Sequence, residues 1–135
     1  MESTIKWHHG TSSFMADKIL KEGFKANPYP GIWGCAVYLT SRASEAKTYG
    51  NTILTAEGTN EDVLFLNYQE DIPSIFPGLS YEEEEACRGL QDYTLEKGYK
   101  ACALTYGNGD IHLIVYDTSF FTFIDLDEEA TESIA

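Results

Sequence analysis

The stretch that decides the fold is residues 5–13, Ile5-Lys6-Trp7-His8-His9-Gly10-Thr11-Ser12-Ser13. Its first four residues predict a short strand, which leads into a turn at the Gly-Thr pair. One of the two serines then caps a helix, because a serine side chain accepts a hydrogen bond from the first free backbone N–H groups. Gly23 is a typical helix stop. The apolar residues spaced four apart within this predicted helix are Met15, Ala16, Ile19 and Leu20.

The remainder of the chain predicts short alternating elements. Further strands are predicted at residues 36–40, 52–56, 63–66, 100–106, 110–117 and 119–124. The strands at 52–56 and 63–66 are joined through a polar turn, and those at 100–106 and 110–117 form a hairpin around Gly-Asn-Gly. Helices are predicted after Ser41, ending at Gly50, and after Ser80, where Glu83 completes a capping box. Loops are predicted at residues 27–34 and around Pro73 and Pro77.

The order of these elements indicates an α+β domain with an antiparallel or mixed sheet system. The chain has 135 residues, which fits one domain. We assign residues 1–125 to that domain and residues 126–135 to an acidic C-terminal tail.

The charge of the chain excludes some kinds of partner. Its 22 acidic residues exceed its 9 basic residues and give a net charge of −13. Much of the acidity lies in residues 82–85 and 125–132, as in a solvated helix start and a solvated tail. Nucleic-acid binding depends on Lys and Arg that neutralise phosphates, so we expect no nucleic-acid partner. No apolar run approaches the ~20 residues of a membrane span, so we expect no membrane partner.

The cysteines and the N-terminus bear on the compartment. Cys35, Cys87 and Cys102 have no C-x-x-C spacing, which disfavours a zinc site and indicates reduced, partly buried thiols. The first residues, MESTIKWHHGTSS, have no signal-peptide pattern. We therefore expect a cytoplasmic location, or delivery into a host cytoplasm, and no bound metal.

Three segments hold residues suited to chemistry. They are the His-Gly pair at residues 9–10, Tyr38 with Tyr49 eleven residues later, and His112 on the last strand of the hairpin. Each alone has an ordinary structural interpretation, since glycine suits a turn and the aromatic residues suit a core. The three segments in this order and spacing are a more specific indication of a functional site than any one of them alone.

In that order the segments resemble the ADP-ribosyltransferase fold, in its diphtheria-toxin-like and poly(ADP-ribose) polymerase-like branch. In that family a strand ending in His-Gly-Ser/Thr precedes a helix with an Ile-Leu-x-x-Gly-Phe/Leu pattern, and this chain has HGT at residues 9–11 and ILKEGF at 19–24. A Gly-x-Gly-Ile-Tyr-Phe segment and a second tyrosine follow, matched by GCAVY at 34–38 and by Tyr49. A Gly-Tyr-Asp-Ala-like segment is matched by GYKA at 98–101. The resemblance covers most of residues 5–125.

The resemblance implies two small antiparallel or mixed sheets, flanked by short helices, that form a cleft for NAD. His9 would bind ribose hydroxyl groups, and Gly10 would offer its backbone N–H and C=O to the nicotinamide carboxamide. Tyr38 and Tyr49 would stack on the nicotinamide ring. The hydroxyl groups of Thr11 and Ser44 would support these NAD-binding residues from a second layer.

One position departs from the family pattern. The family's glutamate aligns with His112, and a neutral imidazole keeps a hydrogen bond to the ribose 2′-hydroxyl but supplies no anion where positive charge develops. Asp110 lies two residues earlier on the same strand face and would fill the position after a register slip. The third alternative is that neither residue fills it. Ala46 stands where the family often has a small hydroxyl residue, which removes one carboxamide contact.

The function that the resemblance implies is an NAD-dependent mono-ADP-ribosyltransferase that releases nicotinamide and modifies a protein acceptor. His9, Tyr38 and His112 would be catalytic, with NAD as co-substrate. The alternative is a non-catalytic module that binds NAD or ADP-ribose, and a third interpretation is an interaction domain with an ordinary aromatic core. A related branch that transfers an RNA 2′-phosphate to NAD needs basic side chains, which two arginines do not supply. We expect Tyr29 and Trp33 to contact the adenosine half of NAD.

Overall fold

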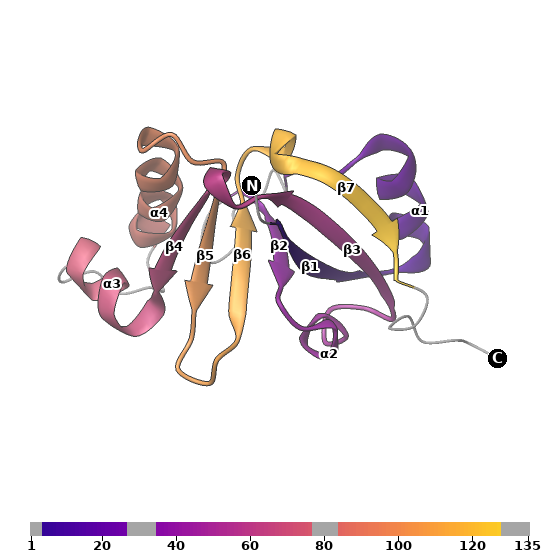
Figure 1. Ribbon diagram of the computed structural model, residues 1–135, viewed down its shortest axis with the longest axis horizontal. Coiled ribbons are helices and arrows are strands. Elements are labelled where there is room, and N and C mark those ends of the chain that lie inside the picture. Colours follow the sequence, from indigo (N-terminus) through magenta and orange to yellow (C-terminus); the bar gives the residue numbers. More distant parts are fainter. Residues whose placement is uncertain (1–3, 27–34, 77–83, 128–135) are drawn as a thin grey trace.

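The computed structural model describes residues 4–26, 35–76 and 84–127, and it has the α+β architecture that the element order predicts (Figure 1). The strands are β1 (Thr4–Thr11), β2 (Val37–Thr40), β3 (Thr52–Thr59), β4 (Val63–Asn67), β5 (Ala101–Thr105), β6 (Ile111–Val115) and β7 (Phe121–Leu126). The helices are α1 (Ser13–Glu22), α2 (Ala43–Ala46), α3 (Tyr68–Ile75) and α4 (Glu84–Glu96). Two 3-10 turns, Asn60–Asp62 and Thr118–Phe120, precede β4 and β7.

All seven strands belong to one curled sheet in the order β4-β5-β6-β2-β1-β3-β7. Only β4 and β5 are parallel to each other, and every other pair is antiparallel. The expectation of two separate sheets is therefore wrong. The strands form one hydrogen-bonded sheet, because β1 and β2 join its two halves. They do so through a single pair of residues, His8 with Thr40.

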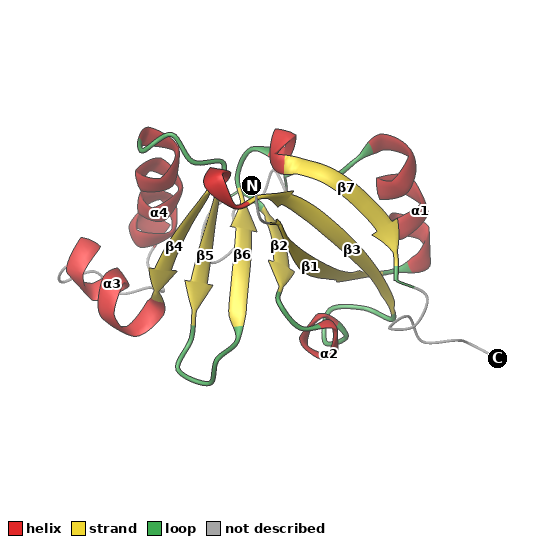
Figure 2. Ribbon diagram, viewed as in Figure 1, coloured by secondary structure: helices red, strands yellow, loops and turns green. Residues whose placement is uncertain are grey.

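The sheet buries a core on each of its two faces. Along β6, Leu113 and Val115 belong to one cluster and Ile114 to the other, as the alternation of side chains on a strand requires. The first cluster packs under α1 through Ala16 and Ile19. The second packs against Ile72 of α3 and Leu90 of α4 and is otherwise formed by Ala36, Cys102, Leu104, Ile114 and Tyr116. Figure 2 shows α1 at one end of the molecule and α3 with α4 at the other.

Helix α1 follows the sequence prediction closely. Ser12 is its N-cap and accepts from the Met15 N–H at 3.2 Å. Gly23 ends it with φ of 83°, a left-handed conformation that glycine adopts without strain. The pattern of burial is only half as predicted, because Ala16 and Ile19 are buried whereas Leu20 is 41% exposed.

Helix α3 contradicts the loop predicted around Pro73. The Asn67 side chain accepts from the N–H groups of Gln69 and Glu70, and the carboxylate of Asp71 accepts from the Asn67 N–H. These caps stabilise the helix start. Pro73 removes only one backbone donor from a short helix, so the helix tolerates it.

The hairpin of β5 and β6 around residues 107–109 is confirmed. Strand β1 runs on through Gly10 and Thr11, so the turn predicted there is wrong. Strand β7 extends to Leu126, one residue into the predicted tail, and the Asp127 N–H donates to the Ile53 carbonyl at 2.9 Å. Helix α4 is present, and Gly98, at φ of 87°, follows it as predicted.

Several predictions lie outside the described residues. These are the loop at 27–34 with Tyr29 and Trp33, Pro77, the capping box of Ser80 with Glu83, and most of the tail. In the three described ranges, no helix has both the length and the apolar character needed to cross a bilayer.

Candidate functional site

The candidate site lies where the sheet opens between β1 and β2. Strand β1 pairs with β3 through eight residues, and β2 pairs with β6 through four, but β1 and β2 share only the His8–Thr40 pair. The two strands separate on the side of that pair toward Gly10 and Tyr38. Two well-paired halves of the sheet therefore meet at one residue pair, and we call the place beside that pair, toward Gly10 and Tyr38, the gap.

Backbone groups of both strands point into this gap. The Ser41 N–H donates to the Ile111 carbonyl, and the Asp127 N–H donates to the Ile53 carbonyl, each at 2.9 Å. Because hydrogen-bonding direction alternates along an antiparallel strand, these bonds direct the backbone of Tyr38 toward β1 and that of Gly10 toward β2. The Tyr38 carbonyl accepts from His9 Nδ1 at 2.8 Å, and no described residue of β2 pairs with Gly10.

The gap opens into a cavity of about 970 Å³, at the upper end of the range for small-molecule and cofactor sites. Strands β1, β2 and β6, helix α1, and the segments after α1 and α2 all contribute to its lining. Six of the seven site residues predicted from the sequence line it, namely His9, Gly10, Thr11, Tyr38, Tyr49 and His112. The seventh, Ser44, is exposed on α2 and is not among the lining residues.

His9 lines the cavity, and one of its ring nitrogens can act as a hydrogen-bond acceptor. A carbonyl oxygen only accepts, so the bond to Tyr38 requires the proton on His9 Nδ1 and leaves the lone pair on Nε2. Burial lowers the pKa of His9 below its ordinary value of 6.5, and the bond to the Tyr38 carbonyl opposes part of that shift. The ring packs edge-on against Phe24, with centroids 5.1 Å apart. His9 is thus a neutral, oriented acceptor at pH 7.

The pKa of His9 gives a testable dependence of stability on pH. Below pH 6.5 the unfolded chain binds a proton at His9 more readily than the folded protein does. The free energy of unfolding therefore decreases as the pH falls through 6.5 toward the lower folded-state pKa. We expect urea unfolding to show a smaller decrease between about pH 7 and about pH 5 in His9→Phe than in the wild type. Equal decreases would contradict the assignment of a buried neutral imidazole.

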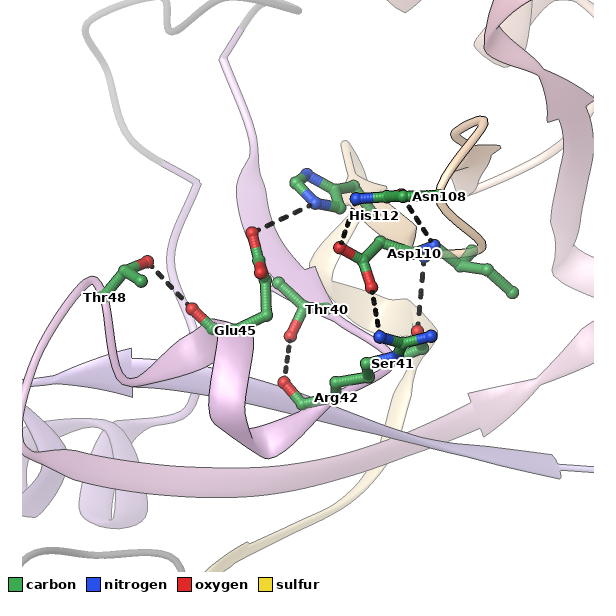
Figure 3. Close-up of polar contacts among 9 residues, drawn as sticks. Thr40, Ser41, Arg42, Glu45, Thr48, Asn108, Asp110 and His112 are labelled. Carbon is green, nitrogen blue, oxygen red and sulfur yellow. Dashed lines mark hydrogen bonds and ion pairs between the residues drawn. The ribbon is translucent and has the colours of Figure 1, made fainter.

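The structure gives His112 and Asp110 different surroundings (Figure 3). His112 lines the cavity, and its ring lies 4.8 Å from that of Tyr106, centroid to centroid. Asp110 is not a lining residue. Its carboxylate binds Arg42 at 3.1 Å and accepts from the Asn108 side chain at 3.0 Å. Of the two residues weighed for the glutamate position, only His112 faces the cavity.

Gly10 has a packing role that the sequence did not reveal. A Cβ atom at this position would lie 1.8 Å from the Ala46 carbonyl oxygen and 3.3 Å from the Gly50 nitrogen. Helix α2 therefore approaches β1 as closely as the backbone allows. This close contact fixes α2, and with it the residues that follow the helix, at the rim of the cavity.

Tyr49 lies at that rim rather than on a helix. Helix α2 ends at Ala46, and the Tyr49 N–H donates to the Ala46 carbonyl at 3.0 Å, so the predicted extension of the helix to Gly50 is wrong. The Tyr49 side chain is 66% exposed. It borders the cavity with one side open to solvent.

The sequence reasoning missed Glu45 and Tyr106. Glu45 lies in α2 with Oε1 3.8 Å from His112 Nε2, and Tyr106 lies on the β5–β6 hairpin against the same ring. In the sequence, a glutamate of a short predicted helix looks like any other solvent-exposed acidic residue. Only the pairing of β2 with β6 brings it to His112.

The thiol of Cys102 does not belong to this site. It is fully buried, and burial raises its pKa to about 12, so it stays protonated and unreactive. Among the described residues, no three His, Cys, Asp or Glu side chains are grouped so as to hold a metal ion.

Comparisons with known proteins give little further guidance. No protein-family model matches the sequence, and no curated protein matches it. In structure the chain is similar to one described as "Crystal structure of an anti-CRISPR protein", with 13% sequence identity, coverage of 91% of this chain and 95% of that one, and a TM-score of 0.49. A resemblance of this size does not define a shared fold.

Proposed function

We propose that this protein has the ADP-ribosyltransferase fold and is an NAD-dependent mono-ADP-ribosyltransferase. The observation that supports the proposal most strongly is that His9, Tyr38, Tyr49 and His112, which are far apart in the sequence, line one cavity. His9 and Tyr38 lie on β1 and β2, beside the single paired position of these strands, whereas Tyr49 follows α2 and His112 lies on β6. The order and spacing of these residues in the sequence also resemble that family.

The lining residues suit the chemical groups of NAD. His9 Nε2 would accept a hydrogen bond from a ribose hydroxyl group. The backbone of Gly10 would pair with the nicotinamide carboxamide, which needs one donor and one acceptor. The rings of Tyr38 and Tyr49 would pack against the nicotinamide ring. The volume of about 970 Å³ is adequate for a ligand of this class.

The proposed reaction is a substitution at the anomeric carbon of the nicotinamide ribose. The bond to the pyridinium nitrogen breaks, and its electron pair stays with the ring, which leaves as neutral nicotinamide. A nucleophilic atom of the acceptor forms the new bond to that carbon and loses its proton to solvent or to a base. Because His112 replaces the family's carboxylate, transfer of a single ADP-ribose is expected rather than a polymer.

We propose a protein as the acceptor. At a net charge of −13 the chain repels polyanions, so nucleic acid is disfavoured on electrostatic grounds. A neutral or basic protein surface would meet it faster, with a rate that falls as salt is added.

A second candidate function is a binding module that holds NAD or ADP-ribose without turnover. The observation that favours it is the imidazole at the glutamate position, since His112 carries no negative charge. Nicotinamide release over time from NAD, compared between the wild type and His112→Ala, separates the two candidates. Release by the wild type supports the transferase. No release above background, with NAD still raising the melting temperature, supports the binding module.

The exposed position of Tyr49 yields a prediction for its role. Tyr49→Ala should leave the fold intact, because the side chain is 66% exposed. If the ring stacks on nicotinamide, NAD affinity should fall by about 1 kcal/mol, or roughly fivefold. Calorimetric titration with NAD measures this. An unchanged dissociation constant in the folded variant would remove the stacking role.

A further inference from the structure

Glu45 is held against His112 by a network of contacts between α2 and the β5–β6 hairpin (Figure 3). Its carboxylate oxygen lies 3.8 Å from His112 Nε2. Arg42, the residue before α2, binds Asp110 at 3.1 Å, two residues before His112. The Ser41 hydroxyl accepts from the Ile111 N–H at 3.3 Å. Three contacts therefore join residues 41–45 to residues 110–112.

The other side of α2 is fixed as well. The Ala46 carbonyl oxygen packs against Gly10, and the Thr48 hydroxyl donates to the Glu45 carbonyl at 2.8 Å. The Glu45 side chain is partly buried, at 35% exposure, and His112 is similar at 28%. These contacts fix the backbone of Glu45, from which its side chain reaches His112.

We propose that Glu45 positions His112 and that the pair together does the work of a single carboxylate. This inference rests on the proposed function. Glu45 takes the proton-bearing Nε2 side of the imidazole, which leaves the lone pair on Nδ1 as the acceptor for the ribose 2′-hydroxyl. The negative charge of Glu45 then lies behind the imidazole, where it offsets positive charge as the glycosidic bond breaks.

The separation of 3.8 Å fits a pair that tightens when ligand binds. It exceeds the length of a direct hydrogen bond, so the groups interact electrostatically or through a water molecule. Catalytic hydrogen bonds are commonly long in the absence of substrate. Among the described acidic residues, Glu22 of α1 lines the cavity directly, and it serves as the alternative in the test.

The first experiment needs no ligand. Nitrogen-15 NMR of the imidazoles reports which ring nitrogen of His112 carries the proton. We expect the Nε2–H form in the wild type and a loss of that preference in Glu45→Ala. An Nδ1–H form in the wild type, or the same form in both proteins, would overturn the inference whether or not NAD binds.

The second experiment measures nicotinamide release by Glu45→Gln, with Glu57→Gln as the control. Glu57 is a partly buried carboxylate on β3 that does not line the cavity. We expect kcat of Glu45→Gln to fall by roughly tenfold or more with little change in KM, because the lost charge acts on the transition state. Glu57→Gln should match the wild type. Full turnover in Glu45→Gln, or loss in Glu22→Gln instead, would overturn the inference while leaving the transferase proposal in place. If the wild type releases no nicotinamide, the proposed function fails, and the tautomer of His112 still decides whether Glu45 positions the imidazole.

Discussion

Replacing Gly10 with alanine is expected to lower the free energy of unfolding by about 3 kcal/mol or more and to abolish NAD binding. The new Cβ would lie 1.8 Å from the Ala46 carbonyl oxygen, which is a backbone atom and cannot rotate away. Helix α2 must therefore move, and overpacking of this kind typically costs about 1–3 kcal/mol, occasionally more. The displacement carries Tyr49 and Glu45 away from the rim of the cavity.

Urea unfolding measures the change in stability, and Gly107→Ala provides the control. A Cβ at Gly107 would meet the Gln69 side-chain amide at 2.9 Å, and that flexible group can move aside. The control should therefore unfold close to the wild type. If Gly10→Ala is as stable as Gly107→Ala and still binds NAD, α2 does not contact β1 as described.

The second large effect is expected for His9→Phe, which keeps an aromatic ring against Phe24 but removes both ring nitrogens. The variant should fold, because the contact between His9 and Phe24 is mainly one of ring packing, with centroids 5.1 Å apart. It loses the acceptor at Nε2 and leaves a ribose hydroxyl group without its partner. Such a loss costs about 1–3 kcal/mol of binding free energy, which corresponds to a roughly 5- to 150-fold larger dissociation constant for NAD.

Calorimetric titration with NAD gives this affinity directly. Tyr93→Phe, which removes a phenol oxygen on α4 outside the cavity, should bind NAD like the wild type. If His9→Phe is folded and its affinity for NAD equals that of Tyr93→Phe, then His9 does not contact the ligand.

The local features of the fold were predictable because they depend on neighbouring residues. Ser12 and Gly23 delimit α1 through capping and backbone conformation, which are properties of the adjacent chain. The β5–β6 hairpin follows from Gly-Asn-Gly between two apolar runs. The grouping of His9, Tyr38 and His112 was predicted through the family resemblance, because spacing alone does not fix which strands are neighbours.

The features that were not predictable depend on contacts between distant segments. Strands β3 and β4 follow each other in the sequence but lie in opposite halves of the sheet, and no local signal distinguishes this from a hairpin. The sequence predicts a loop around Pro73, whereas the structure has helix α3 there, because the capping by Asn67 and Asp71 outweighs one lost donor. The position of Glu45 beside His112 follows from the β2–β6 register.

The most direct test of the central claim is a crystal structure of the protein grown with NAD. We expect a dinucleotide between β1 and β2, with the nicotinamide ring between Tyr38 and Tyr49 and a ribose hydroxyl group on His9. A dinucleotide bound elsewhere, or an empty cavity at millimolar NAD in a protein that releases no nicotinamide, would contradict it.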